Sequence, residues 1–574
     1  MIWTIETFPL LRFPSVSTVN IFRFRFFPAV FLCSIIFTLV ACNIRPTPGV
    51  NAPPGATTQA TQVTNATSAP DSTPTTIPPT AAPVPTRPTV HHTVDSIVIA
   101  GVGTPSHEIT SLPEFIADGI FDSLLTVNPK DGSLAPGLAE QWLVSDDAKT
   151  FEFTLRQGVK WHDGQPLTTA DVVFTLKSLS DPAIRIKPAA DFGPIADVTA
   201  PDARTVRVTF REPYCAALTY IGGVKILPKH RMENKSLTDV VPEDLIGTGA
   251  LVLQSWDDNA LTFSSNTTYW NGAPQIVNWT YKIFPNERAA LDALSQGQAD
   301  LMVGTSAGPS IQDAVAPANE FYALAMNLTR KPFDDVRVRQ AVAMGIDRAQ
   351  LTQSIGADAQ TLETSVLPSF WATPNVRQPE YDIAKARQLL SDAGWRDSDG
   401  DGILNKDGKP FQVSFWAEAD DLHAELAAQI LRAQLERIGV RAIIKLDDHI
   451  LFLTRVFLQE YDLSLAHFKI PLDPDQHYFW ASSENKPGYG LNVTGYTNAR
   501  VDDALAVGNR VSKCNAPARK NVYAPVFQQL ASDVPMVLLF APPRIVNTSP
   551  QLQGIAPSSF AGPFWNLNTW ELAP

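Results

Sequence analysis

Residues 151–176 read FEFTLRQGVKWHDGQPLTTADVVFTL, and this stretch decides the fold class. Phe151, Phe153 and Leu155 alternate with polar residues, which is the period of a half-buried β-strand. The Asp-Gly pair at 163–164 supplies the chemistry of a tight turn. An apolar run follows, so the stretch predicts a strand, a turn and a helix in succession.

Helices are predicted from their ends as well as from their apolar stripes. Thr168, followed three residues later by Asp171, is a variant of the capping box that starts a helix. Farther along, Asp382 can cap a helix whose apolar stripe runs through 383–393 and which Gly394 ends. These signals place one helix after the first turn and another in the second half of the chain.

Strand and helix signals alternate along the rest of the chain. Alternating apolar residues predict a strand over 205–210. Another helix ends at Gly439 and leads into a strand-like segment at 440–446. The stripe predicted for that helix consists of Leu422, Leu426, Ile430 and Leu435. This succession predicts an α/β architecture, and no internal repeat at a fixed period is visible.

The first 42 residues are predicted to be a targeting segment. Arg23 and Arg25 precede an apolar run over 26–40, too short for a hydrocarbon core of about 30 Å. A positive flank, a short apolar core and a small-residue exit are typical of an export signal. The exit at 39–42 reads LVAC and resembles the lipobox of bacterial lipoproteins, in which the cysteine, here Cys42, carries the lipid. A plain signal peptide or a short buried helix is the alternative, and the true translation start stays open.

Composition divides the remainder into a stalk and a body. Residues 43–92 are dominated by Pro, Thr and Ala and carry almost no charge, so they cannot bury enough surface to offset the entropy of ordering. They predict a disordered stalk stiffened by proline. Residues 93–574 read as globular protein and exceed one core of typical size, which predicts two or three lobes. The net charge of −13 argues against a nucleic-acid partner.

The four cysteines have different expected fates. Cys33 lies in the signal and Cys42 is the predicted lipidation site, so only Cys215 and Cys514 remain in the body. These two can pair in an oxidising compartment. Pairing cannot be deduced from sequence alone, so both the disulfide and the free thiols stay open.

One motif suggests a hydrolase. Residues 304–308 fit the G-x-S-x-G pattern, which would make Ser306 a nucleophile. A nucleophile elbow needs a helix directly afterwards, whereas Pro309 follows here, and the downstream histidines stand in no recognisable setting. A catalytic Ser306 is therefore disfavoured, and the sequence predicts a protein that is not an enzyme.

An acidic cluster imitates part of a calcium loop. Asp397, Asp399, Asp401 and Gly402 match its first half, but the twelfth position is Gly408 instead of the bidentate Glu that a tight site needs. A Gly/Asp-rich turn is the favoured interpretation, with a weak ion site as the alternative. No other metal motif and no phosphate loop occurs, so no cofactor is predicted.

Longer blocks of sequence resemble a known family. They read LAPGLAEQW at 134–142, FEFTLRQGVKWHDGQPL at 151–167, GTG at 247–249, YWNG at 269–272, PFDDVRVRQA at 332–341, IDR at 346–348 and DVP at 533–535. In this order they resemble the extracellular solute-binding proteins of oligopeptide, dipeptide and nickel ABC importers. The resemblance covers essentially all of residues 93–574.

The resemblance implies two lobes joined by a hinge, in a periplasmic-binding-protein-like α/β fold with an extra subdomain. Lobe 1 is expected at about 93–118, 246–324 and 535–574, the subdomain at about 119–245, and lobe 2 at about 325–534. Ligand would be trapped where the lobes close, since it touches both lobes only in that state. The implied partners are a peptide-like solute and the ABC permease, with the protein a monomer held extracytoplasmically at the membrane through Cys42.

The same resemblance points to two ligand-binding segments. An extended stretch before the first helix runs beside the bound peptide in relatives, and a second segment ends in an acid and a proline. Candidate ligand-binding residues are Ile109, Thr110, Ser111, Phe192, Ala466, His467, Phe468, Lys469, Ile470, Asp473, Asp475, Tyr478 and Trp480. A role in the hydrophobic core is an equal alternative for Phe468, Tyr478 and Trp480.

One departure from the family pattern concerns the ligand's amine. Counting back from Asp473-Pro474, the aspartate that holds the α-amine in peptide-binding relatives is replaced by Ile470. A buried ammonium without a carboxylate partner costs several kcal/mol. Either Asp473 or Asp475 takes over, or the ligand lacks a free α-amine; the nearby Lys469 favours the latter.

The function predicted from sequence is that of a lipid-anchored, substrate-binding protein of an ABC importer. Two other classes stay open as alternatives: a tethered serine hydrolase that uses Ser306, and a non-transport sensor or chaperone with the same fold. The ligand's identity, whether peptide, metal chelate, glycan fragment or another solute, is left open, as is the type of cell envelope.

Overall fold

The computed structural model describes most of the body. The described residues are 95–105, 108–180, 192–235, 237, 240–304, 312–356, 358–419 and 421–573. They belong to one compact unit. The predicted signal at 1–42 with Cys42, the predicted stalk at 43–92 and Ser306 lie outside the described residues.

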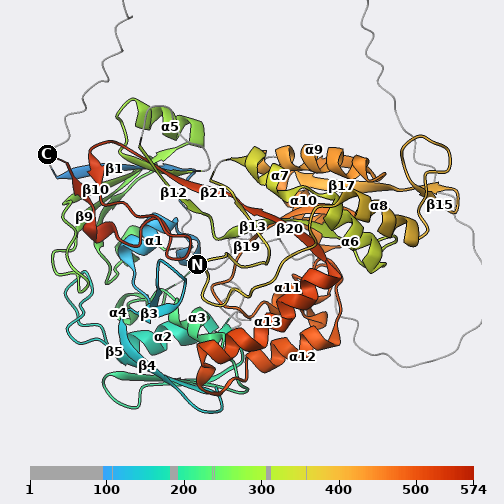
Figure 1. Cartoon of the computed structure of the whole chain (residues 1–574). Helices are drawn as coiled ribbons and strands as arrows, with labels where there is room; N and C mark the ends of the chain where they lie inside the picture. The colour runs from blue at the N-terminus through green and yellow to red at the C-terminus, as the bar shows by residue number, and fades with distance from the viewer. Residues whose placement is uncertain are drawn as a thin grey trace, which may run out of the picture. The chain divides into compact units, whose positions relative to one another are not determined.

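A seven-stranded sheet organises the first lobe (Figure 1), in the order β12-β21-β11-β1-β10-β9-β8. Its strands are β1 (Ser96–Val102), β8 (Leu251–Trp256), β9 (Ala260–Ser265), β10 (Asn278–Phe284), β11 (Leu301–Gly304), β12 (Gln312–Pro317) and β21 (Pro543–Thr548). β1 pairs in parallel with β10 and β11, whereas β8, β9, β12 and β21 make antiparallel pairs. Helices α1 (Glu114–Ile120) and α5 (Glu287–Ser295) supply buried residues to two separate clusters beside this sheet.

A six-stranded sheet organises the second lobe, in the order β14-β20-β13-β19-β17-β18. Its strands are β13 (Glu320–Met326), β14 (Gln360–Thr361), β17 (Gln412–Glu418), β18 (Arg441–Asp447), β19 (Leu463–Lys469) and β20 (Met536–Ala541). Its helices are α6 (Val336–Gly345), α7 (Arg348–Ile355), α8 (Ile383–Asp392), α9 (Leu422–Arg437), α10 (His449–Phe457), α11 (His477–Trp480), α12 (Ala499–Gly508) and α13 (Ala516–Asp533).

A four-stranded antiparallel sheet, in the order β4-β5-β7-β6, forms the subdomain. It comprises β4 (Ala139–Val144), β5 (Thr150–Leu155), β6 (Ile195–Thr199) and β7 (Thr205–Phe210), with helices α2 (Thr169–Ser180), α3 (Ala217–Gly222) and α4 (Lys229–Met232). Three small ladders complete the pairing: β2 (Leu125–Val127) with β3 (Leu134–Pro136), β15 (Asn405–Lys406) with β16 (Lys409–Pro410), and β22 (Leu552–Gln553) with β23 (Glu571–Leu572).

The hydrophobic cores follow this division. One continuous cluster joins lobe 1 to the subdomain, because residues of β1 and β10 and residues of β5 and β7 belong to it together. Two further clusters lie on the two faces of the lobe 2 sheet, and Phe560 of lobe 1 belongs to one of them. Residues of α6, α8 and α9 cover one face, and residues of α10, α12 and α13 cover the other. Lobe 1 and the subdomain therefore share a core, whereas lobe 2 is organised around its own sheet.

The chain crosses between the two large sheets at two adjacent places. β12 ends at Pro317 and β13 begins at Glu320, while β20 ends at Ala541 and β21 begins at Pro543. The two crossings touch, because the backbone N–H of residue 318 donates to the carbonyl of residue 542 at 2.8 Å. The sheet topology puts β13 and β20 in lobe 2, whereas the boundary expected at 324/325 cuts through β13 and the one expected at 534/535 assigns β20 to lobe 1.

Most elements expected from sequence occur where they were predicted. β5 buries Phe151, Phe153 and Leu155, and the strand predicted over 205–210 is β7. The Asp171 carboxylate accepts bonds from the backbone N–H and the hydroxyl of Thr168, each at 2.9 Å. Asp382 caps α8 by accepting the N–H of Lys385. Local capping and turn chemistry therefore set these boundaries.

The stripe predicted for α9 is correct in its second half, where Leu435 is buried and Ile430 packs against the core, and wrong in its first half. Leu422 is 78% exposed and Leu426 is 42% exposed. The buried face instead consists of Ala424, Ala427, Ala428, Leu431, Gln434 and Leu435. Alanines let the helix approach the sheet closely, so the large side chains at the start of the helix turn outward.

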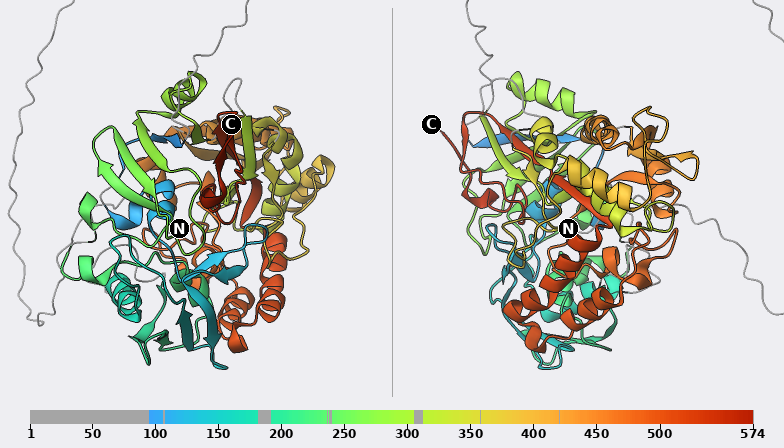
Figure 2. Two further views of the ribbon diagram at one scale, coloured as in Figure 1. Left: turned by 90° about the vertical axis from the view of Figure 1, so that its left-hand side faces the viewer. Right: turned by 45° about the vertical axis from the view of Figure 1, so that its right-hand side comes forward.

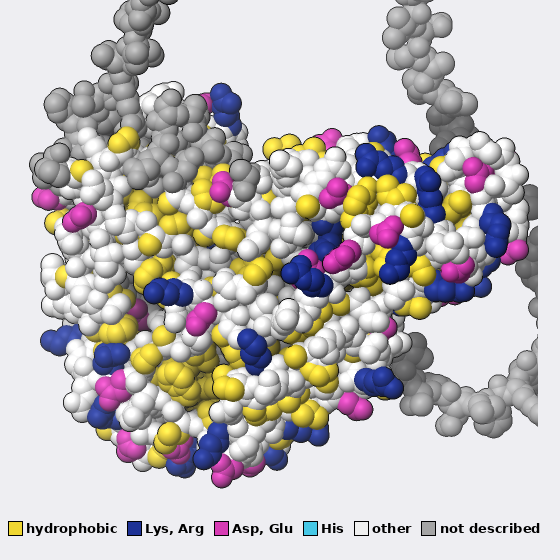
Figure 3. Space-filling view, viewed as in Figure 1, with side chains coloured by type: hydrophobic (Ala, Val, Ile, Leu, Met, Phe, Trp, Pro, Cys, Tyr) yellow, Lys and Arg dark blue, Asp and Glu magenta, His cyan; other side chains and the backbone are white. Residues whose placement is uncertain are grey.

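Charged side chains of both signs are interspersed on the face drawn in Figure 3. This face shows no continuous basic stripe of the kind that a nucleic-acid partner requires. Within the described part of the chain, we find no helix with the length and apolar character needed to cross a membrane. The views in Figure 2 show the sheets and helices of the same body from two other sides.

Candidate ligand-binding site

The strand β19 has one edge that is only half covered. Along its whole length, from Leu463 to Lys469, it pairs with β13. On its other side it pairs with β17 only through Leu463 and Ser464. Among the described strands, none pairs with that side of β19 from Leu465 onward. The second half of β19 therefore offers an open strand edge.

The backbone direction along this edge follows from one hydrogen bond. The N–H of Ile470 donates to the carbonyl of Asn319, on the β13 side, at 2.9 Å. Successive residues of a strand point their backbone groups to opposite sides, so the N–H groups of Lys469 and His467 point to the open edge. An extended chain can add to such an edge through main-chain hydrogen bonds.

A polar cluster lies on the face of the sheet beside this edge. The His467 ring stacks on Tyr322, with 4.2 Å between ring centroids, and its Nε2 lies 3.0 Å from a carboxylate oxygen of Glu320. The Tyr322 hydroxyl donates to Asp421 at 2.6 Å. Asp421 also caps α9 by accepting the N–H of Ala424. The cluster joins β13, β19 and the start of α9.

Glu320 is held in its ionised form by this setting. Burial alone would raise the pKa of Glu320, but the bond to His467 and the positive charges of His467 and Arg544 lower it to about 2. Arg544 comes from β21 in lobe 1, and its guanidinium lies 4.0 Å from Glu320. The pair places charges of lobe 1 against the start of β13 in lobe 2.

Lobe 1 adds a second carboxylate at the same place. Glu114, in the first turn of α1, lies 3.7 Å from the other terminal nitrogen of Arg544. Burial raises the pKa of Glu114, although the charges of Arg544 and Lys469 oppose that rise. Because Lys469 belongs to the open half of β19, this half of the strand lies near charged groups of lobe 1. The geometry suits a ligand that lies between the two lobes.

Comparison with known proteins identifies the family to which this chain belongs. Residues 133–490 match the model of the bacterial extracellular solute-binding proteins, family 5 (middle). The protein belongs to this family. The oligopeptide-binding protein AppA of Bacillus subtilis is 24% identical over 503 residues, which cover 83% of this chain and 91% of AppA. The glutathione-binding protein GsiB of Salmonella typhimurium is 27% identical over 439 residues, covering 71% and 80% of the two chains.

Solved structures show the same two-lobed fold. AppA of Bacillus subtilis in complex with a nonapeptide superposes with a TM-score of 0.67 at 23% identity, covering 83% of this chain and 99% of AppA. NikZ of Campylobacter jejuni, in complex with Ni(L-His), gives a TM-score of 0.68 at 24% identity with the same coverage. A periplasmic oligopeptide-binding protein of Thermotoga maritima gives 0.74 at 19% identity, covering 84% and 100%. The predicted α/β fold of two lobes is confirmed.

In this family 5 member, the Asp473 carboxylate already forms hydrogen bonds with another side chain of the same protein. Arg519 donates to both of its carboxylate oxygens, at 2.9 and 2.6 Å, and both side chains are buried. The Thr219 hydroxyl donates to the same carboxylate at 3.1 Å. Asp473 therefore anchors the connection after β19, and this disfavours the idea that it receives a ligand ammonium.

Asp475 is likewise engaged. It accepts the backbone N–H of His477 at 3.1 Å and a bond from the Asn509 side-chain amide. Burial would raise the pKa of Asp475, but the bonds to His477 and Asn509 and the charge of Arg519 lower it. The alternative in which Asp475 takes over the role of the missing aspartate is disfavoured for the same reason.

The remaining candidates divide between core and edge. Phe192, Ala466, Phe468, Ile470 and Trp480 are buried within hydrophobic clusters, whereas Tyr478 is half-buried. This burial agrees with the core alternative for Phe468 and Trp480. His467 and Lys469 are the candidates in this segment that lie at the polar cluster.

The stretch before the first helix differs from the expected extended form. Ile109–Ser111 is a short 3-10 helix, because the N–H of Ser111 closes a turn onto the carbonyl of Glu108 at 2.9 Å. The N–H of Ile109 donates to Leu237 at 3.1 Å, so this backbone group already has a partner. The backbone of Thr110 belongs to the same turn. The expectation of an extended segment here is wrong.

Three charged residues beside the crossings between the two large sheets were not predicted from the sequence. Glu114, Glu320 and Arg544 come from three distant parts of the chain and match no spacing motif. The one available signal was their position: Glu114 opens the first helix, and Glu320 follows a break between two strands. Only the pairing of β13 with β19 and the nearby crossing to β21 bring them together.

The acidic cluster lies elsewhere, in an exposed turn of lobe 2. One oxygen from each of Asp397, Asp399 and Asp401 lies within 4.8 Å of the others. Asp397 accepts the N–H groups of Gly400 and Gly402, at 2.7 and 3.1 Å, which organises the turn itself. These bonds agree with the favoured interpretation as a turn, and the weak ion site stays a prediction.

Proposed function

We propose that this protein is the substrate-binding lipoprotein of an ABC importer. In this proposal it captures an oligopeptide or peptide-like solute between its lobes and delivers it to the membrane permease. The observation that carries the proposal is the open half of β19, which lies beside the charged contact between Glu320 of lobe 2 and Arg544 of lobe 1. A peptide can extend the sheet there through main-chain bonds, which tolerate varied side chains.

The names of the relatives support this class of ligand. AppA was solved with a nonapeptide, and DppA of Helicobacter pylori with the peptide STSA. GsiB is named for glutathione, which is itself peptide-like. The comparisons give no support to the hydrolase alternative through Ser306 or to a non-transport role, because these relatives are named as binding proteins.

We further propose that the protein is attached to the outer face of a membrane. Lipid on Cys42 would hold the protein there, and the Pro/Thr/Ala-rich segment at 43–92 would hold the body away from the bilayer. The body acts as a monomer in this proposal. Radiolabelled palmitate should enter the wild-type chain expressed in a lipoprotein-processing host, and Cys42→Ser should abolish that labelling.

The ligand proposed here does not depend on a free α-amine. Ile470 occupies the position of the family aspartate, while Asp473 and Asp475 are paired within the fold. Mass spectrometry of small molecules that co-purify with the full chain, followed by calorimetry with the compounds found, tests the proposal. Binding of a peptide or peptide-like solute with a Kd in the micromolar range or tighter is expected. Hydrolysis of such a solute by the pure protein, without stable binding, would contradict the proposal.

A further inference from the structure

Lobe 2 has a third covalent connection to the rest of the body. The β12–β13 and β20–β21 crossings are the first two, and they lie in contact with each other. The third is the disulfide between Cys215 and Cys514, which are separated by 299 residues. Cys215 stands just before α3 in the subdomain, and Cys514 lies between α12 and α13 in lobe 2. We infer that this disulfide is a tether that limits how far lobe 2 can swing away from the subdomain.

The position of the disulfide gives it this effect. Two adjacent crossings alone permit rotation of one lobe about the axis that runs through them. In Figure 1, β12 and β21 lie in the upper half of the body, whereas α3 and α13 lie in the lower half. A disulfide keeps its two Cα atoms within about 7 Å of each other. Any rotation that separates α3 from α13 is therefore stopped by the bond.

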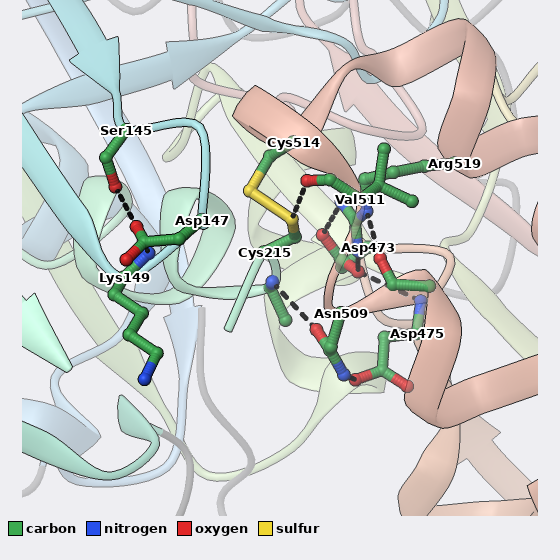
Figure 4. Close-up of a disulfide and its surroundings, with 12 residues drawn as sticks. Ser145, Asp147, Lys149, Cys215, Asp473, Asp475, Asn509, Val511, Cys514 and Arg519 are labelled. Carbon is green, nitrogen blue, oxygen red and sulfur yellow. Dashed lines mark hydrogen bonds and ion pairs between the residues drawn. A yellow bond between two sulfur atoms is a disulfide. The ribbon is translucent and has the colours of Figure 1, made fainter. Parts of the chain in front are cut away.

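The loop that contains Cys514 has an unusual backbone conformation and packs against lobe 1 and the subdomain. Lys513 and Cys514 have φ angles of 55° and 49°, in the left-handed region that residues other than glycine rarely adopt. Cys514 is 7% exposed and belongs to the core cluster of lobe 1 and the subdomain, and Val511 packs against that cluster. Figure 4 shows both cysteines between the subdomain and the helices of lobe 2.

Hydrogen bonds beside the disulfide also join the subdomain to lobe 2. Asn509, at the end of α12, accepts the N–H of Cys215 with its carbonyl and the N–H of Ala216 with its side-chain oxygen, both at 3.2 Å. Its amide group also donates to Asp475 (Figure 4). The Thr219 hydroxyl bonds Asp473 across the same junction. Such single bonds can open transiently, whereas the disulfide keeps the partners close enough to re-form them.

The experiment compares amide hydrogen exchange in the full wild-type chain and in the double variant Cys215→Ser/Cys514→Ser, without ligand. The amides at positions 215 and 216 and the segment 509–515 should exchange at least tenfold faster in the variant. The amides of β5 and of α13 beyond its first turn should exchange at the wild-type rate. This result would show that the junction opens while both sides remain folded. It requires no ligand, so its outcome is independent of the proposed function.

Two results would overturn the inference. Unchanged exchange at 215–216 and 509–515 would show that the hydrogen bonds alone keep the junction closed. Acceleration that spreads through β5 and β7 would show that the disulfide stabilises the subdomain itself. If the double variant does not fold, reduction of the folded wild-type chain with a phosphine gives the same comparison, with the unreduced protein as the control.

Discussion

Arg519 donates one hydrogen bond to each carboxylate oxygen of Asp473, at 2.9 and 2.6 Å, and both side chains are almost fully buried. Removing one charge of a buried pair leaves the other without compensation, which costs about 3–5 kcal/mol. Asp473→Asn should therefore lower the free energy of unfolding by about that amount. Urea denaturation followed by circular dichroism measures it.

The same pair offers a matched control. The double variant Asp473→Leu/Arg519→Met removes both charges and keeps apolar volume, so it should regain most of the lost stability. A variant with Asp473→Asn that is as stable as wild type would show that the pair contributes little. Ligand affinity of the folded fraction should stay within about threefold of wild type, since the carboxylate is used inside the fold.

The pH dependence of stability should carry a contribution from Glu320. Its pKa is lowered in the folded protein to about 2, from an ordinary value of 4.5. A depressed folded pKa means that the stabilisation is complete above pH 4.5 and is lost as the pH falls from there toward 2. Between pH 6 and pH 2 the wild-type protein should lose about 3 kcal/mol of stability through Glu320, and Glu320→Gln should lack this loss.

Measurement of the free energy of unfolding between pH 2 and 6 for both proteins gives the difference curve. The exposed Glu425 serves as the control position, and Glu425→Gln should reproduce the wild-type curve. If Glu320→Gln and wild type lose stability in parallel over this range, the assigned ion pairing of Glu320 is wrong.

Restoring the family aspartate should not restore an amine site. Ile470 is 5% exposed and packs in a core cluster of lobe 2. A carboxylate there would lose its hydration, so Ile470→Asp should destabilise the fold by about 3 kcal/mol or more. The control Ile470→Val should cost about 1 kcal/mol. Thermal unfolding compares them, and an Ile470→Asp protein with full stability and tighter binding of free-amine peptides would contradict this account.

Ligands with a blocked amine should bind as well as those with a free one. The position of the family aspartate is apolar and buried in a core cluster, and Asp473 and Asp475 are engaged within the fold. An N-acetylated peptide and its free-amine counterpart should therefore have dissociation constants within about threefold, a difference of about 0.7 kcal/mol. Isothermal titration calorimetry compares the two. A hundredfold preference for the free amine would require a carboxylate partner that this account does not supply.

The open edge of β19 can be tested by a backbone change. Lys469→Pro removes an N–H that points to the open side, whereas Lys469→Ala removes the side chain and keeps the N–H. Proline at an outward-facing edge position is tolerated. We expect the proline variant to fold and to bind its ligand at least tenfold more weakly, and the alanine variant to bind within about threefold of wild type, that is within about 0.7 kcal/mol. Equal losses for both variants would assign the effect to the side chain.

Local signals predicted much of the fold. The strand at 205–210 and the caps at Asp171 and Asp382 depend on residues close in sequence, so propensity and capping chemistry suffice to place them. The predicted stripe of α9 is wrong at Leu422 and Leu426 because the neighbouring sheet selects which face of a helix is buried, and at the start of α9 the buried residues are alanines. Local periodicity does not contain that information.

The site was predictable only in part. The family pattern located the segment around His467 and Lys469, but the open edge depends on where β17 stops pairing with β19. The side chains of Glu320 and Arg544 come together only in the folded chain, because Arg544 lies more than two hundred residues from Glu320 in sequence. The pairing of Cys215 with Cys514 stayed open for the same reason and is settled by the structure.

In the proposed complex, a peptide-like ligand adds to the open half of β19. Residue-resolved amide hydrogen exchange, with and without the bound ligand, measures whether it does. The N–H groups of His467 and Lys469 should slow at least tenfold when ligand binds, while the N–H of Phe468, directed toward β13, should be slow in both states. Unchanged exchange at His467 and Lys469 in a protein saturated with ligand would contradict the account.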